Sequence, residues 1–540
     1  MSASLDTTDA VIIGSGPNGL VAGIALARRG WDVTVLERSP QAGGAIQTAE
    51  LTEPGFKHDT YSAFYGLLHR SPVFAALGLG AAVDWAHFDT PVGAAVEPSR
   101  AAVIHRDVER TAAGLGAADA GAWRELVAWW SRTGERFFAA TLEPAGAARP
   151  MLRLARRTKV KGGFELLRTM LMPIERYARE RFSTDEARAL IAAGTTHTDL
   201  SIEAAATTAG AVILAMLAQT AGMPVPVGGA GELARALVRQ LDEAGGVLRT
   251  GDRVSRVVVE RGRAVAVETD GGAVVRARHA VIAGTGPGAL FMDMVGEGEL
   301  PAGFVDGLRR YRYGTGIFKM DVALRGPVPW LAEDVRRAGV VHLTGTLDGM
   351  ARAAFESGRG LLPARPLLIC GQQTVADPSR APEGCHTLWI ETQVPGIPRG
   401  DGDSDAELAG WSDDARDGFA ERVLDRVEQF APGTRALIAG VAVRTPRDLE
   451  RENPNLVGGD LGGGSQALDQ QLVFRPVPGW FRYRTPVKGL YLCSASVHPG
   501  AGVHGMGGWN CARRVLRDSI RPRGVMKTAS SARRSPTRPR

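Results

Sequence analysis

Residues 9–44 read DAVIIGSGPNGLVAGIALARRGWDVTVLERSPQAGG, and this stretch is the strongest indication of the fold. It begins with a short apolar run typical of a strand and continues with Gly14, Gly16 and Gly19 at the spacing G-x-G-x-x-G. In such a turn the first glycine permits a tight bend, the second lets the backbone approach a pyrophosphate, and the third lets the next helix pack closely on the strand. The pattern predicts the start of a dinucleotide-binding unit.

The residues after the turn strengthen this prediction. We expect a helix over 20–29, whose N-terminal dipole of about +0.5 charge faces the phosphates, and then a strand over 32–36. That strand leads to Glu37, whose carboxylate can bind both hydroxyls of an adenosine ribose and disfavours the 2′-phosphate of NADP. Gly43 and Gly44 follow, and FAD-binding chains of the glutathione-reductase-like superfamily use such a pair for a second close approach to the cofactor. We therefore predict FAD.

Length, composition and charge limit the remaining possibilities. A chain of 540 residues with 44% hydrophobic residues can build several domains with large cores. Its formal charge of +6 comes mainly from residues 521–540, which hold seven Lys and Arg and no acid, so the rest of the chain is close to neutral. We expect that tail to be disordered and solvated, and we expect no nucleic acid partner.

The cysteines and the apolar stretches exclude several classes of protein. The four cysteines include no C-x-x-C or C-x4-C pair near the first glycine motif, which excludes a dithiol flavoenzyme, and we expect no metal site. The N-terminus has no cationic flank before an apolar core, so no signal peptide is predicted. The longest apolar stretch, residues 204–223, is interrupted by Thr, Gln and Gly and is expected to be a buried helix. These features predict a cytoplasmic protein.

The cofactor domain is expected to be discontinuous. A glycine turn and an amphipathic helix follow Pro224, alternating strands run through residues 246–275, and an apolar strand at 280–283 leads into Gly284. In flavoproteins of this class the first of those strands lies beside the adenine, which places Val254 there.

We predict an α/β fold, with a Rossmann-like FAD-binding domain of the glutathione-reductase-like superfamily and an inserted mixed α+β substrate domain. The FAD-binding domain is expected to comprise residues 1–80, 224–295 and 471–520, the substrate domain residues 81–223 and 296–470, and the disordered basic tail residues 521–540.

A third glycine-rich segment lies near the C-terminus. Residues 488–518 read KGLYLCSASVHPGAGVHGMGGWNCARRVLRD, which predicts a strand over 489–493, a glycine loop and a helix that starts near Trp509. If the loop lies against the flavin, the helix N-terminus stabilises negative charge that develops on the ring. The alternative is a loop that only closes a domain.

These segments together resemble the phytoene dehydrogenase-related flavoproteins, a family that includes carotenoid desaturases, isomerases and ketolases. The resemblance rests on GSGPNGL with ERSPQAGG, on GMPVPVGGAGELARAL and on GLYLCSASVHPGAGVHGMGGWNCARR, and it covers about residues 8–518. Ala45 stands where carotenoid desaturases usually have Arg, which is closer to the branch containing pyridine nucleotide-disulfide oxidoreductase domain-containing protein 2. Val497 replaces the usual Thr before His-Pro-Gly, so a hydroxyl near the flavin is missing.

The resemblance implies FAD-dependent removal or relocation of hydrogen on a lipophilic, often polyene, substrate, with hydride transfer to flavin N5. His504 is the first candidate proton acceptor, because an ordinary histidine pKa near 6.5 suits that task, and His498 is the second. The structural alternative for His498 is a side chain that bonds loop carbonyls. Lys319 either approaches the flavin through water or, more commonly for a strand lysine, reaches solvent. Tyr61, Phe64 and Tyr65 either line the substrate mouth or pack in the core.

The residues expected to bind FAD are Gly14, Gly16, Pro17, Asn18, Gly19, Glu37, Arg38, Gly43, Gly44, Ala45, Val254, Gly284, Ser496, Gly505, Met506 and Gly507.

Three functions are compatible with these features. A desaturase, isomerase or oxidase of an isoprenoid-like substrate is favoured, a flavin amine or amino-acid oxidase comes second, and a non-enzymatic FAD-binding interaction protein comes third. Residues 151–172 interleave Leu, Met and Phe with Lys and Arg and a single acid. This segment predicts either a peripheral contact with an anionic membrane or a basic helix face on the substrate domain.

Overall fold

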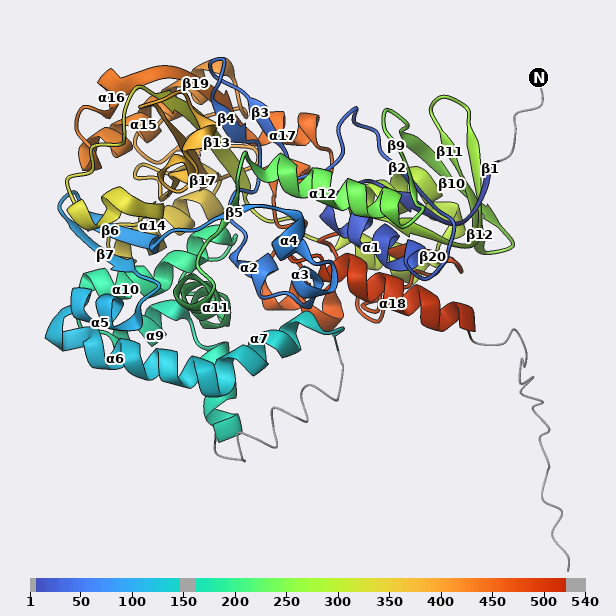
Figure 1. Ribbon diagram of the computed structural model, residues 1–540, viewed down its shortest axis with the longest axis horizontal. Coiled ribbons are helices and arrows are strands. Elements are labelled where there is room, and N and C mark those ends of the chain that lie inside the picture. Colours follow the sequence, from blue (N-terminus) through green and yellow to red (C-terminus); the bar gives the residue numbers. More distant parts are fainter. Residues whose placement is uncertain (1–5, 146–161, 521–540) are drawn as a thin grey trace, which may run out of the picture.

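The computed structural model describes residues 6–145 and 162–520 and contains two large β-sheets, one in each half of the molecule (Figure 1). The first sheet has the strand order β10-β11-β12-β1-β2-β9, and β20 also pairs with β12. Strands β9, β2, β1, β12 and β20 run parallel, whereas β10, β11 and β12 form an antiparallel meander. The bounds are β1 Asp6–Ile13, β2 Val33–Leu36, β9 Val247–Arg249, β10 Val254–Glu260, β11 Arg263–Thr269, β12 Val274–Ala283 and β20 Leu490–Leu492.

Three helices accompany this sheet, and α1 (Pro17–Ala27) contacts both α12 (Ala230–Glu243) and α18 (Met506–Ile520). The helix predicted over 20–29 begins earlier, because Pro17 at its first turn has the required φ and needs no hydrogen bond there. Helix α18 likewise begins before Trp509. The predicted α/β fold with a Rossmann-like sheet is confirmed.

The second sheet has the order β19-β13-β17-β16-β14-β6-β7 and is mostly antiparallel. Its strands alternate between two faces, as the two-residue period of a strand requires. Phe318, Met320 and Val322 of β13 pack with the apolar residues of α15 (Asp413–Phe430), whereas Lys319 and Asp321 lie on the opposite face. The bounds are β6 Thr90–Glu97, β7 Arg100–Ile104, β13 Gly316–Leu324, β14 Ala338–Leu343, β16 Leu368–Gly371, β17 His386–Val394 and β19 Ile438–Arg444.

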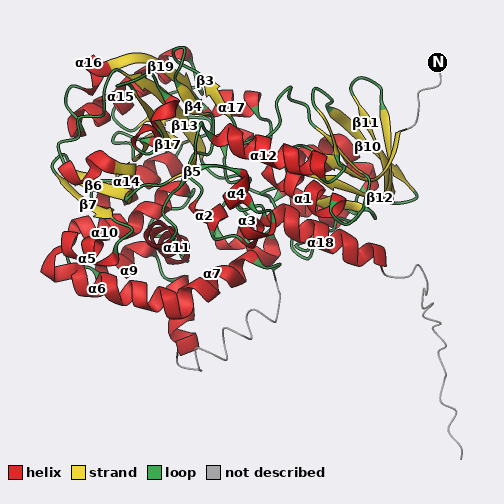
Figure 2. Cartoon of the chain, viewed as in Figure 1, coloured by secondary structure: helices red, strands yellow, loops and turns green. Residues whose placement is uncertain are grey.

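A group of helices lies on one side of the second sheet, as Figure 2 shows. These are α5 Val108–Gly114, α6 Gly116–Trp129, α7 Glu135–Leu142, α9 Ile174–Arg181, α10 Asp185–Ala192 and α11 Thr207–Thr220. Helix α11 is the buried helix predicted within 204–223. No helix among the residues described here is both long and apolar enough to cross a membrane.

Smaller elements are distributed over both halves. They are β3 Thr48–Glu50, β4 Lys57–Asp59, α2 Gly66–His69, α3 Pro72–Ala76, α4 Leu79–Ala82, β5 Trp85–Ala86, β8 Val225–Pro226, α13 Ala302–Arg309, α14 Leu347–Gly358, β15 Leu361–Leu362, β18 Gly400–Asp401, α16 Thr434–Leu437 and α17 Pro446–Glu452.

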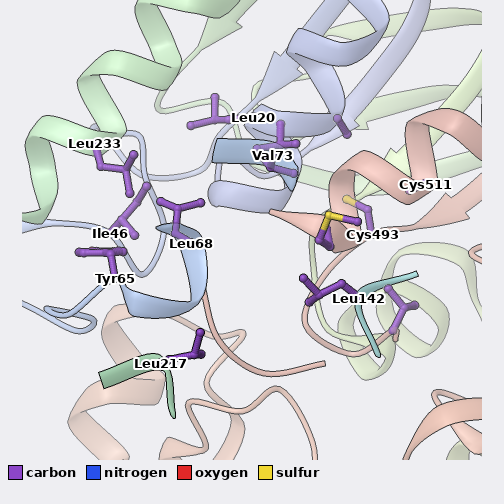
Figure 3. Packing of buried hydrophobic residues seen from close by; sticks show 14 of the residues in the cluster. Leu20, Ile46, Tyr65, Leu68, Val73, Leu142, Leu217, Leu233, Cys493 and Cys511 are labelled. Atoms are coloured by element: carbon purple, nitrogen blue, oxygen red, sulfur yellow. The ribbon is translucent and has the colours of Figure 1, made fainter. Parts of the chain in front are cut away.

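One continuous apolar core joins the two halves. Leu20 of α1 and Leu233 of α12 belong to the same cluster as Leu217 of α11 and Leu142 of α7 (Figure 3). All four cysteines are free thiols, and Cys370, Cys493 and Cys511 are buried. The exact limits predicted for the two domains stay predictions. The tail at 521–540 and residues 151–161 of the basic segment lie outside the described residues.

Candidate active site

A cavity of about 1660 Å³ begins at the carboxyl ends of the parallel strands and extends to the polar face of the second sheet. Gly14, Glu37, Gly284 and Ser494 all line it, and each follows the end of β1, β2, β12 or β20 within two residues. Ligands of open α/β sheets bind at this edge, because the loops after parallel strands converge there. The cavity therefore lies where the glycine pattern predicted a dinucleotide.

The three glycines of the first turn have three different surroundings. Gly14 has φ +92°, which favours glycine. A Cβ on Gly19 would lie 2.1 Å from the Gly14 carbonyl oxygen, so the turn and α1 can meet only without a side chain there. A Cβ on Gly16 would meet no atom within 4 Å, although Gly16 lines the cavity. Protein packing does not require glycine at position 16, whereas a closely bound ligand would.

Glu37 lines the cavity, but most of its carboxylate is already occupied. One oxygen accepts hydrogen bonds from the Ser15 backbone N–H and hydroxyl, both at 2.8 Å, and the other accepts from the Ser39 N–H at 2.8 Å. A carboxylate has about four acceptor positions. Glu37 therefore holds the glycine turn and retains capacity for about one further donor, and its predicted contact with the ribose hydroxyls stays a prediction.

The second glycine pair divides between the cavity and the protein interior. Gly44 and Ala45 line the cavity. A Cβ on Gly43 would instead lie 2.7 Å from the Ile46 carbonyl oxygen and 2.9 Å from the Ala234 Cβ. Packing against α12 thus explains Gly43.

The C-terminal loop also differs from the expectation. Ser496, His498 and His504 line the cavity, whereas Gly505, Met506 and Gly507 are not among its lining residues. A Cβ on Gly507 would lie 2.6 Å from the Cys493 carbonyl oxygen, so this glycine permits the close contact of α18 with the end of β20. Contact of these three residues with a cofactor stays a prediction.

His504 is placed to donate a hydrogen bond. Its Nδ1 accepts the Met506 N–H at 3.1 Å, and its Nε2 is buried without a partner among the described residues. Burial, together with nearby His498, lowers the pKa of His504 to about 4. The neutral ring thus carries its proton on Nε2, which argues against the predicted role of proton acceptor.

His498 has the opposite arrangement. Its Nε2 donates to the Glu143 carbonyl oxygen at 2.9 Å, which leaves Nδ1 as a buried acceptor without a described partner. Burial also lowers the pKa of His498. The structural alternative, a histidine that bonds a loop carbonyl, therefore describes this side chain.

The residues at this end of the cavity fit a dinucleotide. Thr285 Oγ1, His498 Nδ1 and His504 Nε2 are buried polar atoms of cavity-lining residues that lack partners within the described part of the chain. Such atoms are costly unless a ligand or water satisfies them. Pro17, Asn18, Arg38 and Val254 also line this end.

Apolar side chains line the other end of the cavity. Tyr61 and Phe64 are among its lining residues, whereas Tyr65 is fully buried in the core and does not line it. The remaining apolar lining includes Val92, Phe137, Phe138, Leu142, Leu167, Met170, Leu171, Leu190, Ile213, Leu214 and Ile369.

Charged side chains cover the adjoining face of the second sheet. Lys319 is 1% exposed, and its Nζ contacts both oxygens of Asp321 at 2.5 and 2.6 Å. The expectation that this lysine reaches solvent is wrong, because its strand is buried on both faces. Arg444 donates to the same Asp321 carboxylate at 2.7 Å.

Sequence reasoning missed three polar residues that line the cavity. Burial raises the pKa of Glu391 to about 8, and its Oε1 has no partner among the described residues. His197 donates from Nε2 to His342 Nε2 at 3.0 Å, because the His342 Nδ1 proton is donated to the Gly93 carbonyl oxygen. The available signal was one acid directly after the apolar run at residues 388–390 in the strand HTLWIETQV, residues 386–394.

Comparisons with known proteins agree with this geometry. Residues 18–516 match the family described as flavin containing amine oxidoreductase. The rat (Rattus norvegicus) pyridine nucleotide-disulfide oxidoreductase domain-containing protein 2 is 30% identical over 94% of this chain and 93% of its own. One of the subunits of limonene dehydrogenase from Castellaniella defragrans is 27% identical, and a neurosporene-forming phytoene desaturase of Cereibacter sphaeroides is 24% identical, each over 94% of both chains.

A solved structure has the same fold. An oxidoreductase from Methanosarcina mazei has a TM-score of 0.60 and 17% identity, and the match covers 94% of this chain and 99% of that one.

Proposed function

This chain belongs to the flavin containing amine oxidoreductase family, its cofactor is FAD, and we propose that it dehydrogenates or isomerises a lipophilic, isoprenoid- or polyene-like substrate. The names of two relatives, a limonene dehydrogenase and a phytoene desaturase, support this substrate class. The predicted resemblance to the phytoene dehydrogenase-related flavoproteins is confirmed by the same relatives.

The lining of the cavity carries the proposal. The cavity measures about 1660 Å³ in all, and beyond the glycine turn, where the cofactor would bind, it continues into a chamber with mostly apolar walls. Such a chamber favours a long apolar substrate, because burial of apolar surface contributes about 25 cal/mol per Å².

When bound, FAD would supply the oxidising power, as the acceptor of a hydride. The chain itself binds and orients the substrate and excludes water. The N-terminus of α1 and Gly16 would hold the pyrophosphate, and His504 would donate its Nε2 proton in a hydrogen bond without releasing it. The apolar side chains of the chamber would keep water from the reacting carbon atoms.

Anaerobic titration of the purified yellow protein tests the proposal. We expect an isoprenoid hydrocarbon such as phytoene or limonene to bleach the flavin absorbance, and putrescine or benzylamine to leave it unchanged. Bleaching by the amines alone would assign an amine oxidase. No bleaching by either class, together with recovery of the hydrocarbon in unchanged isomeric form, would favour a non-enzymatic flavoprotein.

We also propose that the substrate enters from a membrane surface beside the helical residues 162–171. Phe164, Leu167 and Leu171 are 68%, 53% and 47% exposed, and the last two also line the cavity. Apolar side chains at the mouth of an apolar cavity can enter the lipid interface. Flotation with anionic liposomes should recover the wild-type chain and lose the Phe164→Ser, Leu167→Ser double variant, and equal recovery of both would refute the contact.

A further inference from the structure

Five side chains form a row across the second sheet. Register places His342 of β14 opposite Ile369 of β16, Ile369 opposite Glu391 of β17, Glu391 opposite Lys319 of β13, and Lys319 opposite Arg444 of β19. Residues directly opposite each other share one face of a sheet, and neighbouring strands are about 4.8 Å apart. His342, Ile369, Glu391 and Arg444 all line the cavity, so this row forms part of its wall.

The charges in this row are paired, with one exception. Lys319 and Arg444 both contact Asp321, and Arg444 also lies 3.4 Å from a Glu452 oxygen. His58 Nδ1 lies 3.7 Å from Asp321. Glu391 is 6% exposed, and its buried Oε1 has no hydrogen-bond partner in the part of the chain that the structure describes. A buried polar atom of this kind is costly unless a ligand or water satisfies it.

The balance of charge indicates which form of Glu391 is present. Lys319 and Arg444 are offset by Asp321 and Glu452, so an ionised Glu391 would add an excess negative charge in a buried site. Burial accordingly raises the pKa of Glu391 to about 8, opposed by Lys319 and Arg444 and assisted by Asp321. At neutral pH the side chain is a carboxylic acid with one O–H donor and free acceptor positions.

We propose that Glu391 binds a neutral oxygen, a carbonyl or a hydroxyl, on an otherwise apolar substrate. The inference rests on the proposed function and specifies its substrate class. A protonated amine fits this position poorly, because Lys319 stands on the neighbouring strand β13 and Arg444 on β19, one strand further along the same row. A hydrocarbon fits the walls but leaves the Glu391 hydroxyl unsatisfied, at a cost that an oxygenated substrate avoids.

Two matched probes test this inference on the FAD-loaded full chain: geranylacetone, an isoprenoid ketone, and β-farnesene, a hydrocarbon of similar length. Calorimetric titration under anaerobic conditions gives the ratio of their Kd values, hydrocarbon to ketone. We expect Glu391→Leu to lower that ratio about 5-fold to 150-fold, the range for one buried hydrogen bond. Glu391→Gln should keep most of the wild-type ratio, because the amide N–H of glutamine still donates a hydrogen bond to the ketone. Glu383→Leu, an exposed glutamate just before β17, is the matched control and should change nothing.

The pH dependence supplies a second readout that a structural role would not move. Below pH 8 the wild-type carboxylic acid donates to the ketone, and above it the ionised group cannot, so ketone affinity should fall between pH 7 and 9.5. The Kd of β-farnesene should stay nearly constant, and Glu391→Gln should show no such fall. The other groups around Glu391 are Lys319, Asp321, His58, Arg444 and Glu452, and they are unchanged in that variant.

The outcomes separate the two levels of the argument. If both probes bind and Glu391→Leu keeps the wild-type ratio, the inference is wrong and the proposed function stands. If neither probe binds, the proposed function is wrong and the inference falls with it. If Glu391→Leu does not fold, the pH profiles of wild type and Glu391→Gln decide, and identical profiles refute the inference.

Discussion

Gly16 at the start of α1 and Gly508 in α18 should respond differently to the same added methyl group. Gly16 has φ −61° and ψ 167°, which alanine adopts readily, and its Cβ would meet no protein atom within 4 Å. We expect Gly16→Ala to change the free energy of unfolding of the FAD-free protein by less than about 0.5 kcal/mol. The methyl group would project where the pyrophosphate approaches, and overpacking of about 1–3 kcal/mol would weaken FAD binding about 5-fold to 150-fold.

Gly508 is different because the added atom would meet backbone. Its Cβ would lie 1.9 Å from the Asn18 carbonyl oxygen, whereas ordinary contact begins at 3.4 Å, so α18 and the start of α1 would have to separate by about 1.5 Å. We expect Gly508→Ala to destabilise the FAD-free protein itself by about 1–3 kcal/mol or more.

Urea unfolding of FAD-free protein and fluorescence titration with FAD measure the two quantities separately. A loss of more than about 1 kcal/mol in the stability of FAD-free Gly16→Ala would contradict the open space at Gly16, and wild-type FAD affinity of that variant would contradict the close approach of the pyrophosphate. Unfolding of Gly508→Ala at the wild-type urea concentration would contradict the contact with Asn18.

Three other predictions follow from buried charges and histidines. Asp321→Asn leaves Lys319 buried without a counter-ion and should cost about 3–5 kcal/mol in urea unfolding, and a loss below about 1 kcal/mol would contradict the pairing. His504 stays neutral in the fold down to about pH 4, whereas an unfolded histidine binds a proton near pH 6.5, so stability should fall as pH drops from 6.5 to 4. His504→Gln should remove about 3 kcal/mol of that fall, and an unchanged pH dependence of unfolding would contradict it. Glu37→Gln should weaken FAD binding and also destabilise the FAD-free protein, because charged hydrogen bonds worth about 1.5–3 kcal/mol each tie Glu37 to Ser15; weaker FAD binding at unchanged stability would restore a purely ligand-binding role.

The sequence predicted the cofactor end of the molecule well, because that end is built from local patterns. The spacing of Gly14, Gly16 and Gly19 determines the turn. A short helix then leads to the next parallel strand, β2. The family match confirms the predicted FAD.

Glycine composition alone could not separate two causes of close approach. Gly16 lines the cavity. At Gly43 and Gly507, other parts of the protein leave no room for a side chain. Those neighbours are Ile46 and Ala234 for Gly43 and Cys493 for Gly507, and Ala234 is distant in the sequence. Only the tertiary structure tells which partner a glycine approaches.

The polar wall of the cavity was not predictable for a related reason. Lys319 and Asp321 are two residues apart, but Glu391 and Arg444 join them only through pairing of β13 with β17 and β19. Burial then favours the ion pair of Lys319 with Asp321 and the protonated form of Glu391, and neither effect has a local signal in the sequence.

The placement of β1 at the centre of the first sheet has a consequence for biosynthesis. Strand β1 ends at residue 13, but its neighbour β12 starts at residue 274 and β20, which pairs with the end of β12, starts at residue 490. At about 5–20 residues per second, a ribosome needs about 13 to 52 seconds to make the chain between β1 and β12, and about 11 to 43 seconds more to reach β20. Through the first interval one edge of β1 is unpaired, and through the second the end of β12 lacks its partner β20. Sheets with such distant pairings fold slowly. We therefore expect the nascent chain to depend on chaperones until its C-terminal segment emerges, and truncations before residue 490 to aggregate.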